Sequence, residues 1–157
     1  MKIKFIVDED FINYKEISMF IGFPKCSFKC DKECGYSICQ NLSIVTMPSI
    51  EISYEEIIKR YLNNPLTKAI VFGGLEPFDT EHDVLQLIKN FRYYTNDPII
   101  IYTGYTEQEL KNNLTLDYLE GENVIIKFGR FKPNQIPHYD KVLGVNLASD
   151  NQYAKKI

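Results

Sequence analysis

Short apolar runs rich in β-branched residues alternate along the chain with segments whose apolar residues have helical spacing. The apolar runs predict strands at residues 3–7, 18–22, 69–72, 99–102, 124–128 and 142–147. Strands that alternate with helices are typical of βαβ units. The pattern therefore predicts an α/β fold with a parallel sheet.

Three predicted helices are marked by a hydroxyl residue three positions before an acid. These starts are Ser53-Tyr-Glu-Glu, Thr80-Glu-His-Asp and Thr106-Glu-Gln-Glu. In such a capping box the hydroxyl and the acid each accept a hydrogen bond from a free backbone N–H group. The second helix also has an apolar stripe that should pack on the sheet, formed by Val84, Leu87, Ile88 and Phe91.

Length and charge narrow the function classes. A chain of 157 residues, 45% of them hydrophobic, suits one domain over residues 1–157. With 18 basic and 21 acidic residues and no basic stripe, we expect no nucleic-acid partner. We find no signal peptide and no apolar run of bilayer length, so we expect no membrane partner and a cytoplasmic location, where thiols stay reduced.

The four cysteines of the chain, Cys26, Cys30, Cys34 and Cys39, lie within fourteen residues. Thiols so close together are better placed to bind a metal or a cluster than to join distant parts of a fold. Nearby lysines, at positions 25, 29 and 32, should favour the thiolate form that binds iron or zinc. A metal or cluster site is therefore the main functional prediction.

The loops that follow the predicted parallel strands should share one edge of the sheet. They contain the cysteine segment, the turn Gly73-Gly-Leu-Glu-Pro77, Thr103-Gly-Tyr105 and Gly129-Arg130. Gly73 and Gly74 let a ligand approach the backbone closely, and Glu76 could accept hydrogen bonds from a cationic amine. This combination suits an amino-acid-like ligand.

Several other residues need no functional role to explain them. His82, His138, Lys127 and Lys132 are expected to be solvated surface residues. Arg130 and the tail 146–152 could contact a cofactor or a partner, or could form an ordinary surface loop. A structural zinc site using all four cysteines is the strongest alternative, but the intervals of three, three and four residues differ from the paired Cys-x2-Cys of zinc ribbons.

Taken in order, the motifs resemble the small radical S-adenosylmethionine enzymes that activate anaerobic ribonucleotide reductase. The resemblance covers nearly the whole chain: Glu9-Asp-Phe-Ile-Asn-Tyr, the cysteine loop, Gly74-Leu-Glu-Pro, Ile101-Tyr-Thr-Gly-Tyr-Thr, Phe128-Gly-Arg-Phe and Ser149-Asp-Asn-Gln. For the fold, we expect the parallel sheet to form a partial, open (βα) barrel of about five to six strands.

The resemblance implies a [4Fe-4S] cluster held by three thiolates, with the fourth iron open to the amino and carboxylate groups of S-adenosyl-L-methionine. The reduced cluster would cleave this cofactor to methionine and a 5′-deoxyadenosyl radical, which would take a hydrogen atom from a glycine of a glycyl radical enzyme. The implied partners are anaerobic ribonucleotide reductase and an electron donor such as flavodoxin or ferredoxin. Another protein, a peptide or a small molecule is the alternative substrate.

The resemblance leaves the third cluster ligand open. Cys26 and Cys30 fit the first part of the family's Cys-x3-Cys-x2-Cys, but the next cysteine, Cys34, comes one residue late. The later tripeptide Cys39-Gln-Asn41 is similar to the Cys-aromatic-Asn that closes the family's loop.

Neighbouring residues guide the choice between these two cysteines. Ile38 gives Cys39 an apolar neighbour where an adenine-packing side chain usually lies, whereas Glu33 would place a charge before Cys34. We therefore expect Cys26, Cys30 and Cys39 as ligands, with Cys34 as the alternative third ligand. We expect no catalytic residues beyond the cluster ligands.

The resemblance also implies a set of cofactor contacts: Gly73, Gly74, Glu76, Pro77, Tyr102, Thr103 and Asn41. Leu75 stands where the family has a second glycine, which places the detail of the methionine contacts in question. For Tyr102 an ordinary strand role is an equal alternative.

Overall fold

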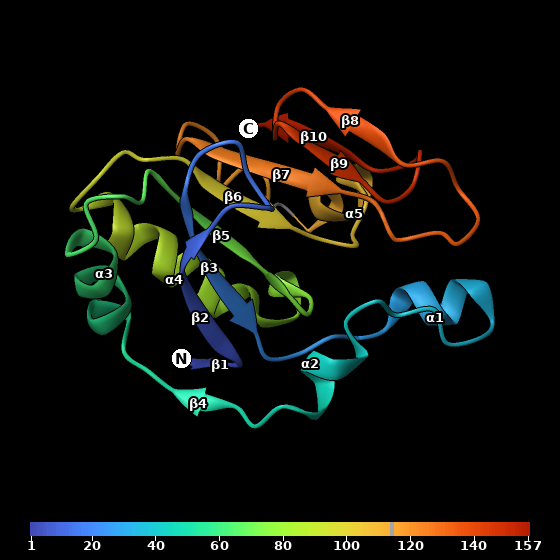
Figure 1. Ribbon diagram of the computed structural model, residues 1–157, viewed down its shortest axis with the longest axis horizontal. Helices are drawn as coiled ribbons and strands as arrows, with labels where there is room; N and C mark the ends of the chain where they lie inside the picture. The colour runs from blue at the N-terminus through green and yellow to red at the C-terminus, as the bar shows by residue number, and fades with distance from the viewer. Residues whose placement is uncertain (114) are drawn as a thin grey trace.

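A six-stranded sheet runs through the centre of the computed structural model, which describes residues 1–113 and 115–157 (Figure 1). Its strands, in spatial order, are β10 (Tyr153–Lys156), β7 (Val124–Phe128), β6 (Ile99–Tyr102), β5 (Ala69–Gly74), β3 (Ser18–Phe23) and β2 (Phe5–Asp10). Two small sheets pair β1 (Lys2–Ile3) with β4 (Ile50–Glu51), and β8 (His138–Asp140) with β9 (Val145–Leu147).

The four central strands, β3, β5, β6 and β7, are parallel, but both edge strands are antiparallel to their neighbours. Only residues 11–17 connect β2 to β3, a connection too short for the crossover that a parallel pair needs. The prediction of a parallel sheet therefore holds for the four central strands and is wrong at the two edges. Curvature into a partial, open barrel stays a prediction.

The strand predictions differ from the structure mainly at the ends of the chain. The strand expected at residues 3–7 is interrupted by a bend at Lys4, which separates β1 from β2. The run at 142–147 yields only β9, which pairs with β8 outside the central sheet. The pattern did not predict β8 and β10.

The helices are α1 (Lys29–Cys34), α2 (Leu42–Thr46), α3 (Tyr54–Leu62), α4 (Glu81–Arg92) and α5 (Glu107–Asn112), with a 3-10 helix, η1, at Pro77–Thr80. Alternate strand residues, such as Ile21, Phe72 and Ile101, form the main core with apolar residues of α3, α4 and α5. The stripe predicted on the second helix is confirmed, because Val84, Leu87, Ile88 and Phe91 are all buried in this core.

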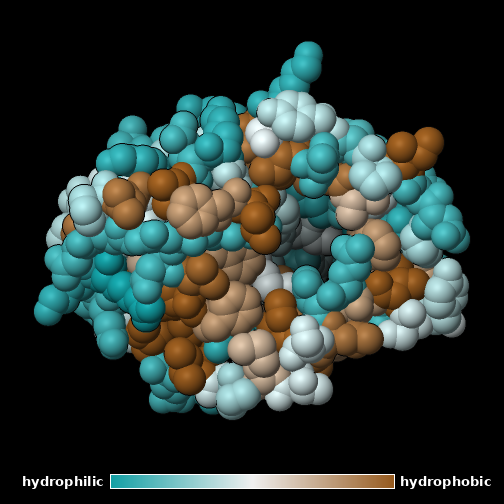
Figure 2. Space-filling model, viewed as in Figure 1, coloured by the Kyte–Doolittle hydropathy of each residue, from teal (hydrophilic) through white to brown (hydrophobic). Residues whose placement is uncertain are grey.

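The opposite face of the sheet has a smaller core. Val71, Ile100 and Ile125 pack there beneath Tyr14 and Leu143, which belong to connecting segments. Apolar side chains also gather on the surface over β2 and β3 in the view of Figure 2. Helices α3, α4 and α5 therefore contribute to the core on one face only, and loops cover part of the other.

Two of the three predicted helix caps are confirmed. The Ser53 hydroxyl accepts a hydrogen bond from the Glu56 N–H, and Thr106 forms a complete capping box with Glu109. The prediction for Thr80 is wrong, since its hydroxyl donates to the Pro77 carbonyl 3.1 Å away. This bond lies within η1, which runs directly into α4, so the Thr80 hydroxyl is used in η1 and does not cap α4.

No helix in the described part of the chain combines the length and the apolar character that crossing a membrane requires.

Replacing Gly74 with Ala should destabilise the fold more than the same replacement at a glycine with nearly the same φ. Gly74 has φ +80°, and an added Cβ would lie 2.9 Å from the Gly22 Cα. Left-handed strain and the backbone clash together should lower the free energy of unfolding by about 3 kcal/mol. Gly121→Ala is the control, with φ +82° and no atom within 4 Å. It should cost about 1 kcal/mol. Equal losses in urea unfolding would contradict the close approach of β3 and β5.

Candidate functional site

Four parallel strands end at one edge of the sheet. Phe23 at the end of β3 pairs with Gly74 of β5, and Tyr102 at the end of β6 pairs with Lys127 of β7. The cysteine segment, the Gly-Gly turn, the Thr103 turn and Gly129-Arg130 all leave from this edge. The predicted convergence of these four loops is confirmed.

Hydrogen bonds join the cysteine segment to the turn after β5 at both of its ends. Just before Cys26, the Lys25 carbonyl accepts a hydrogen bond from the Glu76 backbone N–H at 2.8 Å. Just after Cys39, the Asn41 side-chain Nδ2 donates to the Gly74 carbonyl at 2.6 Å. All four cysteines therefore belong to a loop that begins and ends at one turn.

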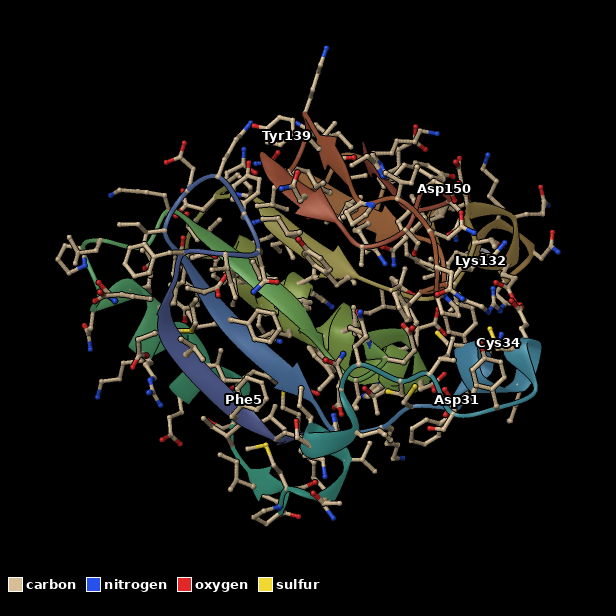
Figure 3. The ribbon with its side chains drawn as sticks, turned by 45° about the vertical axis from the view of Figure 1, so that its right-hand side comes forward. Phe5, Asp31, Cys34, Lys132, Tyr139 and Asp150 are labelled. Atoms are coloured by element: carbon tan, nitrogen blue, oxygen red, sulfur yellow. The ribbon has the colours of Figure 1, made fainter. Side chains whose placement is uncertain are left out.

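The residues between Cys30 and Cys39 are folded locally. They include most of α1, which is followed by its C-cap residue Gly35 in a left-handed conformation with φ +77°. The Ile38 N–H then donates to the Asp31 carboxylate at 2.9 Å. The interval between Cys30 and Cys39 thus forms a short helix and a closing turn. Figure 3 shows Cys34 and Asp31 on this helix.

All four cysteines are free and partly exposed. Burial raises the pKa of Cys26 to about 11, and charges on Glu76, Asp79 and Cys39 act in the same direction. Burial also raises the pKa of Cys30, where Cys39 adds to the effect while Arg130 and Lys127 oppose it. Cys39 therefore lies near enough to influence both thiols.

The expected effect of the neighbouring lysines is wrong for Cys26, because burial and the charges of Glu76, Asp79 and Cys39 all raise its pKa, and only a hydrogen bond from the Phe28 N–H opposes them. Lys29 is engaged elsewhere: its Nζ lies 3.2 Å from a Glu109 carboxylate oxygen and 3.8 Å from the centre of the Tyr105 ring. Cys26 is consequently protonated at neutral pH when no metal is bound. Metal binding would have to release this proton.

No three Cys, His, Asp or Glu side chains within residues 1–113 and 115–157 converge closely enough to hold a metal ion. Cys39 is thus close enough to affect the pKa values of Cys26 and Cys30, but the three thiols are not arranged as metal ligands. Cys34 lies one helical turn beyond Cys30 on α1.

Glu76 joins the turns that follow β5 and β6 through its buried carboxylate, which is 7% exposed. Its Oε1 accepts from the Thr103 hydroxyl at 2.7 Å and from the Phe78 N–H at 3.2 Å, and its Oε2 accepts from the Gly104 N–H at 2.7 Å. Burial raises the pKa of Glu76 to about 7 against these three donors. All of these donors belong to the protein, so Glu76 stabilises the site's framework.

The other expected cofactor contacts have structural roles in the same region. The Tyr102 hydroxyl donates to the Asn13 carbonyl at 2.6 Å, which attaches the loop before β3 to β6. Thr103 is buried beside Glu76, and Pro77 begins η1. At Gly73 a Cβ would lie 2.8 Å from the Phe20 ring, so this strand end has no room for a side chain.

The prediction that Lys127 is solvated is wrong. It is 7% exposed, and its Nζ donates to the Gly129 carbonyl at 2.8 Å. Burial lowers the pKa of Lys127 to about 8, while charges on Glu76 and Cys30 oppose this shift. The available signal was a lysine within the apolar run Val124-Ile-Ile-Lys-Phe, where both faces of the strand are buried.

The predictions for the other residues without an expected functional role have different outcomes. His82 and Lys132 are exposed as expected, whereas His138 is half-buried in β8. The tail is not a free surface loop near Gly129. Its Gln152 side chain donates to the Gly129 carbonyl at 3.3 Å, and its Asn151 side chain donates to the Arg130 carbonyl at 2.9 Å.

Two hollows lie near the start of the cysteine segment and share Pro24 and Lys25. The smaller, about 400 Å³, reaches Cys26 and is lined by Ser27, Phe28, Val45, Leu75 and Asp79 as well. The larger, about 900 Å³, extends away from the cysteines toward β4 and the start of α3. The smaller hollow is therefore the space beside a thiol that a small ligand could occupy.

In a comparison with protein-family models, residues 16–152 match the model described as a 4Fe-4S single cluster domain. The matched span includes all four cysteines and every strand end of the site. No curated protein and no solved structure matches the chain at a significant level.

The raised pKa of Glu76 predicts a specific pH dependence of stability. Its pKa rises from 4.5 to about 7 on folding, so its contribution to stability is complete below pH 4.5 and is lost as the pH rises through about 7. Relative to Glu76→Gln, the apoprotein should lose roughly 3 kcal/mol over this range. Urea unfolding of both proteins at a series of pH values measures the difference. Parallel stability curves would show that the carboxyl is not perturbed.

Proposed function

Since the chain belongs to the 4Fe-4S single cluster domain family, we propose that it is a radical S-adenosyl-L-methionine enzyme that generates a glycyl radical on a partner protein. One observation carries this proposal: the loop containing the cysteines is hydrogen-bonded at both ends to the turn that follows β5. A cluster on this loop and a ligand against the turn would therefore be neighbours.

Cys26, Cys30 and Cys39 are the proposed cluster ligands. Thiolates are the usual protein ligands of iron–sulfur clusters. The charge of Cys39 acts on both Cys26 and Cys30, which supports this set over one that uses Cys34. Three protein ligands would leave one iron for S-adenosyl-L-methionine.

Two cations that act on Cys30 fit an anionic group. Lys127 and Arg130 are each 7% exposed, and their positive charges oppose the rise in the pKa of Cys30. They would stabilise the thiolates that a cluster requires and offset the negative charge of the bound cluster. Because Cys26 is protonated in the apoprotein, cluster assembly should be favoured by higher pH.

S-adenosyl-L-methionine is the proposed second cofactor. The hollow beside Cys26 has apolar walls from Phe28, Val45 and Leu75, and Leu75 belongs to the turn after β5. When bound, the cofactors supply one-electron reduction of the sulfonium, which frees the 5′-deoxyadenosyl group to abstract a hydrogen atom from a glycine. The protein's own task is to bind and orient the cofactors and to exclude water from the site.

The proposed partner is a glycyl radical enzyme, with anaerobic ribonucleotide reductase as the first candidate. This rests on the resemblance of the motifs in order along the chain, from Glu9-Asp-Phe to Ser149-Asp-Asn-Gln. A flavodoxin or ferredoxin is the proposed electron donor.

The proposal predicts 5′-deoxyadenosine as a product. We expect the anaerobically reconstituted and reduced protein to form it from S-adenosyl-L-methionine, and Cys26→Ala to abolish the product by removing a cluster ligand. Liquid chromatography with mass spectrometry provides the measurement. An iron-loaded protein that forms no product would contradict the radical chemistry but not the cluster, whereas one bound zinc and no iron would contradict both.

A further inference from the structure

The helix that carries Cys30 is not held in place by a hydrophobic core. α1 contains six residues, none of them buried. Its N-cap residue, Phe28, has a left-handed backbone with φ +53° and provides no side-chain cap. A helix this short is not stable by itself in water. Contacts from outside α1 must therefore fix its position.

A group of charged side chains provides these contacts. The two terminal nitrogens of Arg130 donate to the Glu109 carboxylate of α5 at 3.0 and 2.6 Å. From α1, Glu33 lies 3.0 Å from the Arg130 Nε, and Lys29 lies 3.2 Å from Glu109. Both charged ends of α1 thus meet one Arg–Glu pair.

Arg130 is itself firmly placed. Only 7% of its side chain is exposed, and its carbonyl accepts the Asn151 side-chain hydrogen bond at 2.9 Å. Glu109 is fixed as well, because it also closes the capping box of α5 with Thr106. The pair is therefore a rigid anchor rather than a mobile surface ion pair.

The anchor lies beside the Cys30 thiol. At Gly104, a Cβ would be 3.7 Å from the Arg130 Cγ, 3.7 Å from the Cys30 Sγ and 3.4 Å from the Glu76 Oε2. The absence of a side chain at this position lets the arginine stem, the thiol and the buried carboxylate come together.

We propose that Arg130 is a positioning residue for Cys30. It holds α1 against α5 through Glu109 and Glu33, and it keeps a fixed positive charge next to the thiol. The inference rests on the proposed role of Cys30 as a cluster ligand and does not depend on S-adenosyl-L-methionine. Part of it can be tested in the apoprotein.

Hydrogen–deuterium exchange of the apoprotein tests the anchoring. Arg130→Ala should speed exchange of the α1 amides roughly tenfold, equivalent to about 1.4 kcal/mol, while α4 is unaffected. Glu109→Gln is the second variant, because Gln also closes a capping box but carries no charge for Arg130. Lys111→Ala is the matched control, since it removes an α5 ion pair with Glu107 and should leave α1 unchanged. Unchanged α1 exchange in Glu109→Gln and in any folded Arg130→Ala would overturn the anchoring.

The midpoint potential of the reconstituted cluster tests the charge. Removing a positive charge disfavours the reduced, more negative cluster, so Arg130→Gln should shift the potential to more negative values. Arg130→Lys should keep the wild-type potential, because lysine retains the charge. Its α1 amides should nevertheless exchange as fast as in Arg130→Ala, because lysine lacks the bidentate geometry. Equal potentials in the wild type, Arg130→Gln and Arg130→Lys would overturn the proposed effect of the Arg130 charge. If the wild type assembles no cluster, the proposed function fails, and α1 exchange alone decides the role of Arg130.

Discussion

Two hydrogen bonds, Glu76 N–H to the Lys25 carbonyl and Asn41 Nδ2 to the Gly74 carbonyl, determine where the chemistry of this protein can take place. They close the cysteine segment onto the turn after β5. The position of this turn is fixed by the left-handed backbone of Gly74, by the close approach of Gly74 to Gly22 and by the buried Glu76 carboxylate. The parallel strands end at one edge of the sheet, and this turn holds the cysteine segment at that edge.

Burial shifts the pKa values of the ionisable groups in the site toward their neutral forms. Burial raises the pKa of Cys26, Cys30 and Glu76 and lowers that of Lys127. The apoprotein therefore keeps the Cys26 thiol protonated, while the cations Lys127 and Arg130 act on Cys30. Since an iron–sulfur cluster held by thiolates is anionic, its assembly would exchange thiol protons for metal and give Lys127 and Arg130 a charge to neutralise.

The sequence predicted the features that depend on local pattern. The central strands follow from β-branched apolar runs, and the caps at Ser53 and Thr106 follow from hydroxyl–acid spacing. Features that depend on distant contacts were missed: the antiparallel edge strands, the buried Lys127 and the anchoring of α1 by Arg130. In the site, spacing identified the cysteines as a group, whereas the influence of Cys39 on Cys26 and Cys30 became visible only with the loop folded.

The most direct test of the account is the iron and sulfide content of two single-cysteine variants after anaerobic reconstitution. The account predicts that Cys34→Ala keeps a full [4Fe-4S] cluster with the wild-type EPR signal of the reduced state. It predicts that Cys39→Ala loses most of its iron, because one of the three thiolates is missing. The reverse outcome, with iron lost in Cys34→Ala and kept in Cys39→Ala, would contradict the proposed ligand set.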